Sequence, residues 1–392
     1  MLKNIKNPNS VEIGIDEFMN IINSNFDDVV IYDFRSEVER SHGSLPKSIY
    51  IDSVKFLSEH IDDPDKNYIL CCSHGKTSTE IANEFREKGL DNYYSLKGGY
   101  ASYVLYVMRH TNEEDTKNDL LKKVEKSIQT NFRVKLMSNF LKAIKNYELI
   151  KENDKIAVCI SGGKDSFLMA MLFRELKKWT KINFDVEYIS MDPGYNEVNR
   201  KLLEENAKAL DIPIKIFESD IFDIVYNEEK SPCYLCARMR RGYLYSFAKK
   251  ISCNKIALAH HYDDVIETIL MGMLYGGQMQ SMLPKLKSIN FEGMQLIRPM
   301  YLIREDDIKA WRDQNDLHFL QCACKFTDTC TSCNNNEAKS KRQEVKSIIK
   351  NLKEKNPYIE SNIFKSAENV QLDTLISYKS KGEKHSFLED FI

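Results

Sequence analysis

The chain has 392 residues, 42% hydrophobic and 29% charged, which predicts two or three globular domains and excludes disordered, collagen-like and repeat proteins. Its formal net charge of −2 gives no global signature of nucleic-acid binding, so any RNA contact must come from local basic patches. No apolar run reaches 18 residues and the first ten residues lack the apolar core of a signal peptide, so we expect a cytoplasmic protein with no membrane partner.

The first hundred residues alternate short strand patterns with helix patterns. Residues 28–34 (DVVIYDF), 67–72 (NYILCC) and 92–96 (NYYSL) are predicted as strands. Residues 79–89 (TEIANEFREKG) have the amphipathic spacing of a helix and end on a glycine. The alternation predicts a small α/β domain, to which we assign residues 1–110.

Dense charge after residue 110 indicates a domain boundary. Helical spacing then continues, so residues 111–150 are predicted to form a helical linker. From residue 155 strands again alternate with longer helices, which is typical of a parallel, doubly wound sheet. The sequence therefore predicts a second α/β domain over residues 151–392, which ends in a basic helical tail.

A glycine-rich loop lies between the first strand and the first helix of this second domain. Its two glycines let backbone amides turn inward, and the following helix adds partial positive charge. The loop is shorter than a Walker motif and resembles the PP-loop of the ATP pyrophosphatases, which implies ATP binding and formation of an adenylate. A connecting turn with no ligand is the alternative. We expect Asp165 to act in catalysis, and the loop residues are Ser161, Gly162, Gly163, Lys164, Asp165 and Ser166.

Three further polar residues follow predicted strands of the same domain. Asp192 follows one strand, and His260 and Asp264 follow another. Ligands of open α/β sheets bind at the carboxyl ends of strands, so we expect these residues beside the nucleotide. Asp264, or its neighbour Asp263, could hold Mg²⁺, which prefers oxygen ligands. The alternative is that these acids only cap a helix.

The ten cysteines of a cytoplasmic chain are better explained as metal ligands or reactive thiols than as disulfides. Cys233 and Cys236 form a C-x-x-C pair, and a third thiolate from Cys322 or Cys324 would complete the ligands of a [4Fe–4S] cluster. Three thiolates leave one iron open to an extra sulfide. The competing interpretation is a structural zinc site formed by Cys322, Cys324, Cys330 and Cys333.

Several motifs occur in a characteristic order: SGGKDS, PCYLC, ALAHHYDDVIETILMGMLYGG and LIRPMYLIREDDI. Over roughly residues 120–375 this order resembles the tRNA 2-thiocytidine synthetase family. The resemblance implies ATP-dependent thiolation of cytidine 32 in the tRNA anticodon loop. It also implies a [4Fe–4S] cluster on Cys233, Cys236 and Cys322. The chain departs from the family at the last site, where it has C-x-C in place of C-x-x-C.

The N-terminal domain resembles the rhodanese sulfurtransferases. The resemblance is carried by Asp33, Arg35 and Glu39, by GSLP, and by the loop CCSHGKTS with a later Gly-Gly pair. It implies that Cys72 is a nucleophile that carries a persulfide, held by the inward amides of a loop before a helix. Thr77 stands where that family often has arginine. A degenerate domain that serves only for docking is the alternative.

Basic residues in two places could contact tRNA phosphates, although an ordinary solvated face also explains them. Three follow the C-x-x-C pair directly, and seven lie in the tail with only three acids. The basic residues are Arg238, Arg240, Arg241, Lys339, Lys341, Arg342, Lys346, Lys350, Lys353 and Lys355.

The combined hypothesis is a tRNA sulfurtransferase that uses ATP, Mg²⁺ and a [4Fe–4S] cluster. A cysteine desulfurase would load Cys72, and the persulfide sulfur would reach the open iron of the cluster. A homodimer is compatible with the sequence. The alternatives are 2-thiouridine formation, lysidine formation without sulfur, and a non-catalytic carrier of sulfur or Fe–S.

Overall fold

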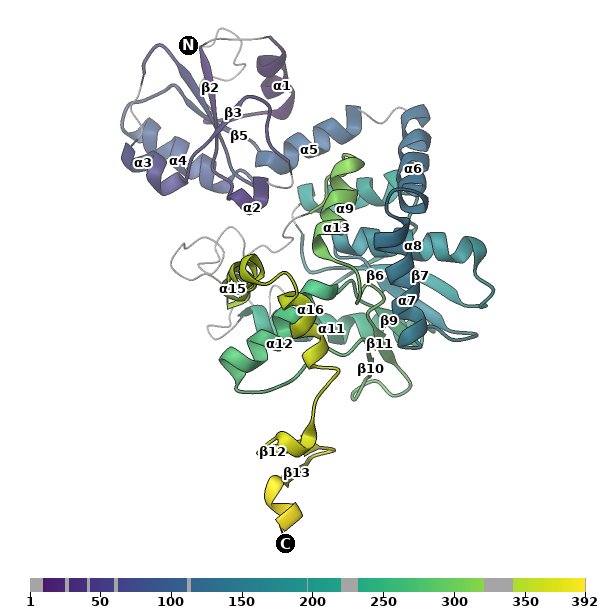
Figure 1. Cartoon of the computed structure of the whole chain (residues 1–392). Helices are drawn as coiled ribbons and strands as arrows, with labels where there is room; N and C mark the ends of the chain where they lie inside the picture. Colours follow the sequence, from purple (N-terminus) through teal and green to yellow (C-terminus); the bar gives the residue numbers. More distant parts are fainter. Residues whose placement is uncertain are drawn as a thin grey trace.

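Two α/β domains follow each other along the chain, and the C-terminal segment extends away from the second domain (Figure 1). Among the described residues, no helix combines the length and the apolar character needed to cross a membrane. The computed structural model describes residues 10–24, 28–40, 43–59, 63–110, 114–195, 197–219, 232–320 and 341–391.

The N-terminal sheet is parallel throughout, with its strands in the order β1-β5-β4-β2-β3. Strand β4 is buried along its whole length, with Ile69 packed into one core cluster and Tyr68 and Leu70 into another. The elements are β1 (Glu12–Ile13), α1 (Ile15–Asn23), β2 (Val29–Asp33), α2 (Glu37–Arg40), β3 (Ser48–Tyr50), α3 (Ser53–Glu59), β4 (Asn67–Cys71), α4 (Lys76–Glu87), β5 (Tyr93–Leu96) and α5 (Gly99–His110).

Three helical segments connect this domain to the second sheet. Helix α6 (Glu114–Gln129) is followed by a π-helical turn, η1 (Arg133–Ser138), and by α7 (Asn139–Asn146). Helix α6 contacts α8 and α9 of the second domain, and its residues Val124 and Ile128 are fully buried. The segment predicted as a linker is therefore packed against the second domain rather than suspended between the two.

The second sheet has the order β10-β11-β9-β6-β7-β8. The predicted doubly wound fold is confirmed, with one difference at an edge. Strand β10 runs antiparallel to β11, because the short connection between them is a hairpin and cannot form a parallel crossover. The strands are β6 (Lys155–Cys159), β7 (Asp185–Asp192), β8 (Ile214–Glu218), β9 (Lys255–Ala257), β10 (Lys285–Lys287) and β11 (Gln295–Ile297).

Helices cover both faces of this sheet, and the tail helices α15 and α16 pack on α12 (Figure 1). A small hairpin, β12–β13, lies beyond them near the C-terminus. The remaining elements are α8 (Lys164–Trp179), α9 (Glu197–Ala209), α11 (Pro232–Lys250), α12 (Tyr262–Gly276), α13 (Glu305–Gln314), α15 (Lys341–Lys355), α16 (Ile359–Ser366), η3 (Leu372–Thr374), β12 (Ser377–Ser380), β13 (Glu383–Ser386) and η4 (Phe387–Phe391).

The strand order places a topological switch point at the centre of the second sheet. Strand β6 pairs with β7 on one side and with β9 on the other, both in parallel. The chain leaves β6 into the glycine-rich loop and leaves β9 into His260 and His261. The two segments therefore end at the same edge, where open α/β sheets bind their ligands.

Helix α5 of the first domain packs against α9 of the second. Val104 and Leu105 on α5 belong to the same core cluster as Leu202 and Leu203 on α9. One apolar core therefore extends across the boundary between the two domains.

Candidate active site

The glycine-rich loop after β6 is closed by its own serine. Ser166 is buried, and its Oγ donates to the carbonyl of Gly163 at 2.9 Å. The backbone N–H of Ser161 donates to the same Oγ at 3.1 Å, and the hydroxyl of Ser161 lies 3.2 Å from it. Ser166 therefore holds the loop in shape, while α8 begins at Lys164 and directs its N-terminus toward the loop.

Gly162 is required by both its backbone and its neighbour. Its φ is +88°, and a Cβ at this position would lie 2.4 Å from Cδ1 of Leu320. The backbone N–H of Leu320 donates to the carbonyl of Gly162 at 3.0 Å. The chain is thus fastened to the loop two residues before Cys322.

Lys164 lies between two carboxylates. Its Nζ is 3.2 Å from the carboxylate of Asp165 and 3.3 Å from Oε1 of Glu305. The other oxygen of Glu305 is 3.3 Å from Nζ of Lys346 in the tail helix. Burial alone would raise the pKa of Glu305, but the ammonium groups of Lys164 and Lys346 outweigh it and hold this pKa well below its usual value. Glu305 is therefore ionised and links the loop to α15.

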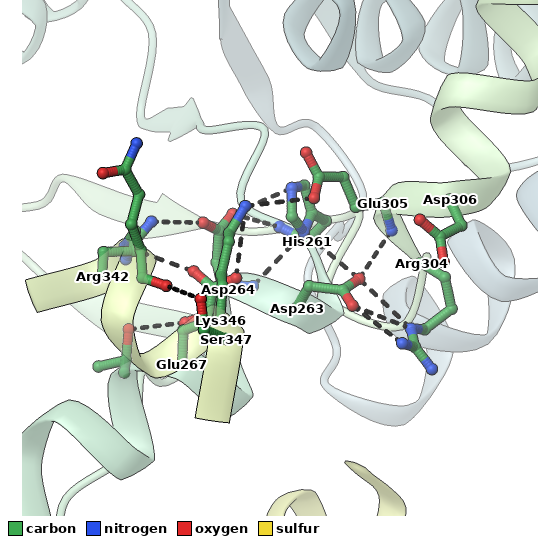
Figure 2. Close-up of polar contacts among 12 residues, drawn as sticks. His261, Asp263, Asp264, Glu267, Arg304, Glu305, Asp306, Arg342, Lys346 and Ser347 are labelled. Carbon is green, nitrogen blue, oxygen red and sulfur yellow. Dashed lines mark hydrogen bonds and ion pairs between the residues drawn. The ribbon is translucent and has the colours of Figure 1, made fainter. Parts of the chain in front are cut away.

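The acids at the start of α12 are engaged by the protein itself (Figure 2). Asp264 accepts from the backbone N–H of His261 at 3.0 Å, and His261 caps the helix in return through Nδ1. The other oxygen of Asp264 is 2.7 Å from Nη1 of Arg342. Burial opposes ionisation of Asp264, yet the neighbouring His261 and the guanidinium of Arg342 lower its pKa.

Asp263 serves the neighbouring helix. It accepts from the guanidinium of Arg304 at 2.9 Å and from the backbone N–H of Glu305 at 2.7 Å, at the start of α13 (Figure 2). Burial would lower the pKa of Arg304, but its hydrogen bonds to Glu360 and Asp263 raise it. Asp263 and Asp264 both accept hydrogen bonds at the starts of helices, which is the alternative role considered for them. Mg²⁺ binding by Asp264 stays a prediction.

His260 and Arg298 follow neighbouring strands, β9 and β11, at the same edge of the sheet. Burial and the nearby charge of Arg298 lower the pKa of His260 to about 4, so the imidazole is neutral at pH 7. Among the described residues its Nδ1 has no hydrogen-bond partner. Burial also lowers the pKa of Arg298 to about 10. A buried cation therefore stands next to a neutral imidazole at the switch point.

Asp192, at the end of β7, is held by its own turn. It accepts from the backbone N–H groups of Gly194 at 2.8 Å and Tyr195 at 2.7 Å, and it pairs with Arg200 of α9. Burial opposes ionisation, but these hydrogen bonds lower the pKa of Asp192. Among the described residues, no three His, Cys, Asp or Glu side chains are grouped as metal ligands would be.

The predicted cluster ligands lie mostly outside the described part of the chain. Cys233 and Cys236 lie three residues apart at the start of α11, but their side chains are not described. Cys322 and the other cysteines of its group lie in residues 321–340, which are also outside it. These ligands therefore stay predictions.

In the first domain Cys72 lies in a loop of donors at the start of α4. The backbone N–H groups of Gly75 and Ser78 donate to its Sγ at 3.1 and 3.5 Å, and the hydroxyl of Ser78 is 3.3 Å away. Gly75 has a φ of +91°, which turns its N–H inward. Such a group of donors can accommodate the sulfur atoms of a persulfide. Cys71 is fully buried in the core, where burial raises the pKa of its thiol.

The remaining residues of the rhodanese-like motif stabilise the structure around this loop. Arg35 and Asp33 form a buried ion pair at 2.6 Å, and the guanidinium of Arg35 stacks on the ring of Tyr100. Glu39 accepts a hydrogen bond at 2.5 Å from the hydroxyl of Ser73, the residue after Cys72. These residues have structural roles rather than direct contact with Cys72.

Several residues at the site were not singled out in the sequence, among them Glu305, Arg298 and Leu320. Arg298 and Glu305 lie within the LIRPMYLIREDDI motif, which carried the resemblance without assigning roles to its members. Arg298 directly follows strand β11 and Glu305 begins helix α13. Their positions at the ends of elements were the signal in the sequence that could have identified them. Leu320 carried no signal, since its role depends on a contact 158 positions away along the printed sequence, from Gly162 to Leu320.

The chain is similar to known proteins along both domains. Residues 130–329, more than half of the chain, match the PP-loop domain family, and residues 15–105 match the rhodanese-like domain family. The tRNA-cytidine(32) 2-sulfurtransferase of Vibrio parahaemolyticus is 36% identical over 267 residues, which cover 66% of this chain and 83% of that protein. The protein of the same name from Geotalea uraniireducens is 32% identical over 244 residues, which cover 61% and 93%.

A more distant likeness exists to a solved structure, the U34-tRNA thiolase NcsA of Methanococcus maripaludis with its [4Fe-4S] cluster. It has a TM-score of 0.47 and 24% identity, and covers 59% of this chain and 76% of that one. A likeness at this level carries no argument about the site. The identity and coverage of the two relatives, together with the PP-loop match, show that this chain belongs to the tRNA-cytidine(32) 2-sulfurtransferase family of PP-loop enzymes and carries a rhodanese-like domain at its N-terminal side.

Proposed function

We propose that this chain thiolates a cytidine of the tRNA anticodon loop in an ATP-dependent reaction, as the names of its relatives describe for cytidine 32. The observation that carries the proposal is the contact between Leu320 and Gly162. It fastens the segment that leads to Cys322 onto the glycine-rich loop of residues 161–166, hereafter the phosphate loop. Sulfur chemistry and nucleotide chemistry would therefore meet at one edge of the sheet.

The first chemical step is adenylation. The amides of the loop and Lys164 bind the pyrophosphate portion of ATP, while O2 of the cytidine attacks the α-phosphorus and pyrophosphate leaves. We propose Asp165 as the loop residue that acts in this step and His260 as a neutral residue that contacts the nucleotide. Mg²⁺ would neutralise phosphate charge, with Asp264 or Asp192 as its carboxylate ligand.

We propose that Cys233, Cys236 and Cys322 hold a [4Fe–4S] cluster. The described backbone fits this in one respect: Cys233 and Cys236 lie one turn apart on α11. When bound, such a cluster supplies an iron with no protein ligand, where sulfur can bind. The competing zinc site is tested by counting iron and zinc in protein purified without oxygen; zinc alone would contradict the cluster.

Sulfur is proposed to arrive on Cys72. A cysteine desulfurase transfers its sulfane sulfur to the thiolate, which becomes a persulfide held by Gly75 and Ser78. Two electrons from a dithiol reductant then release this sulfur as sulfide and restore the Cys72 thiolate. The sulfide attacks C2 of the adenylated cytidine and AMP leaves with the former O2 oxygen.

Exposed basic residues on two helices are proposed to contact tRNA phosphates. Arg238 and Arg241 are exposed on α11, next to the proposed cluster ligands. Lys350 and Lys355 are exposed on α15. Arg342 and Lys346 of the same helix are paired inside the site and are left out of this surface.

Two measurements test the proposal. Nucleoside analysis of tRNA from a deletion strain should show loss of 2-thiocytidine; loss of 2-thiouridine or lysidine would identify an alternative activity instead. With purified protein, tRNA should trigger pyrophosphate release, and Lys164→Gln should abolish it. A wild-type protein that releases no pyrophosphate with tRNA would be a carrier and not an enzyme of this class.

A further inference from the structure

The loop that carries Cys72 packs against Gly98 and Gly99, and Gly98 also faces the second domain. A Cβ on Gly75 would lie 2.8 Å from the backbone N of Gly98, and a Cβ on Gly99 would lie 2.3 Å from the carbonyl oxygen of Cys72. On its other side Gly98 approaches α9: a Cβ on Gly98 would lie 3.8 Å from Cγ2 of Val198. Gly98 therefore lies between the loop that carries Cys72 and helix α9 of the PP-loop domain.

A second contact runs from the first domain to the phosphate loop. A Cβ on Gly43, whose carbonyl accepts from Arg35, would lie 3.4 Å from Cε1 of His318. The carbonyl of His318 accepts from Nδ2 of Asn206 on α9 at 2.9 Å. Two residues further on, Leu320 closes on Gly162. The segment 318–320 thus touches the rhodanese-like domain at one end and the phosphate loop at the other.

From these contacts we propose that Val198 of α9 and the segment 318–320 form a docking surface inside the chain, which holds the Cys72 loop for delivery of sulfur to the PP-loop site of the same molecule. The inference rests on the proposed function. It adds the route by which sulfur reaches the PP-loop site and the surface that holds the Cys72 loop. Docking raises the effective concentration, at the PP-loop site, of the sulfide released from the Cys72 persulfide, where a freely tethered domain would deliver it more slowly. Val198 is a positioning residue, since it is proposed to act through its approach to Gly98.

The substitution Val198→Asp tests this surface. Val198 is in the first turn of α9, where an aspartate suits the helix dipole, so the helix should survive while a charge enters the apolar contact. The matched control is Val134→Asp, the same change on a side chain that is 76% exposed. Three rates are measured: persulfide loading of Cys72, thiolation driven by the loaded persulfide, and thiolation driven by added sulfide.

For Val198→Asp we expect unchanged persulfide loading and unchanged sulfide-driven thiolation, with persulfide-driven thiolation reduced by about tenfold or more because the effective concentration falls. Val134→Asp should match the wild type in all three. A persulfide-driven rate equal to that of the wild type in Val198→Asp would overturn the docking surface. If the wild-type chain fails with sulfide as well as with persulfide, the proposed function itself is refuted, and the two failures are therefore distinguishable.

Mixing two inactive variants gives a test that does not depend on the folding of Val198→Asp. Cys72→Ser retains the phosphate loop, which sulfide-driven thiolation verifies, and Lys164→Gln retains Cys72, which persulfide loading verifies. Delivery within one chain predicts that the mixture stays almost inactive with a persulfide donor. Recovery to a large fraction of the wild-type rate would mean delivery between chains and would overturn the proposal.

Discussion

At the residue scale, Glu305 is the side chain that ties the phosphate loop to the rest of the site. Glu305→Gln removes one of the two carboxylates that fix Lys164 and also removes a negative charge beside the loop proposed to bind phosphates. We expect kcat for tRNA-dependent pyrophosphate release to fall about tenfold, because the ammonium is less well placed. KM for ATP should stay the same or fall, because the loop becomes more positive.

The control for this prediction is Asp306→Asn, the same chemical change one residue later, on a side chain that is 79% exposed. It should leave kcat and KM close to wild type. A higher KM at unchanged kcat in Glu305→Gln would show that Glu305 supports ground-state binding of ATP and does not position Lys164 for the reaction.

The buried imidazole of His260 gives the chain a defined pH dependence. Its pKa of about 4 in the folded protein lies below the unfolded value of about 6.5, so the unfolded chain binds the proton more tightly. The corresponding stability is complete above pH 6.5 and is lost as the pH falls toward 4. Between pH 7 and pH 5 we expect a loss of about 1–2 kcal/mol in the free energy of unfolding.

Urea unfolding at a series of pH values measures this loss, and His260→Gln provides the comparison. Glutamine does not titrate, so the variant should lose less stability over the same pH range by about the amount that His260 contributes. Equal pH dependence in both proteins would assign the effect to other groups. Asp264 and Glu305 have lowered pKa values, whereas burial raises the pKa of Glu267, which changes stability with pH in the opposite direction to His260.

At the element scale, helix α15 is held to the site by buried charge. Arg342 pairs with Asp264 and Glu267, and Lys346 pairs with Glu267 and Glu305. Burial raises the pKa of Glu267, so its ionised form depends on these two cations. The sequence predicted a basic helix here but not its partners, because ion pairs across 41 to 79 positions leave no local pattern.

The double variant Arg342→Gln and Lys346→Gln should loosen this helix. We expect faster hydrogen exchange over residues 341–355 and a loss of about 1 kcal/mol in stability, since both cations are partly exposed. The matched control is Lys350→Gln and Lys355→Gln on the same helix, because these lysines form no ion pair with a described residue. Equal exchange in the two variants would mean that apolar packing of Val345 and Ile349 alone holds α15.

Local patterns were enough to predict the central strands and several helices, but not the short edge elements or how the strands pair. The apolar runs around β4, β6 and β7 and the amphipathic runs around α4 and α9 specify their own elements, since each buries side chains at a regular period. Strands β10 and β11 have three residues each, too few to establish a period, and their antiparallel pairing depends on a hairpin. The site shows the same difference: SGGKDS identified the loop, while Leu320 contacts that loop and Arg342 contacts the start of α12 from distant segments of the chain.

At the scale of the whole molecule, the sequence predicted two domains and left their relative placement open. The contact between them uses glycines, Gly43 and Gly98, whose lack of a side chain permits close approach and leaves no apolar pattern to detect. The apolar part of the contact comes from residues such as Val104 on α5, which also fit an ordinary core. Whether an apolar residue lies in a core shared by two domains depends on the folded chain and cannot be read from the local spacing of apolar residues in the sequence.

A core shared between domains should make them unfold together. Both tryptophans, Trp179 and Trp311, belong to the second domain, so their fluorescence reports that domain alone, whereas far-ultraviolet circular dichroism reports both. In the wild type the two urea transitions should coincide. Val198→Asp weakens the shared contact, so the transitions should separate by roughly 0.5 M urea, while Val134→Asp keeps them together. Separate transitions in the wild type would mean that the interface is too weak to couple the domains, and sulfur delivery would then require transient docking.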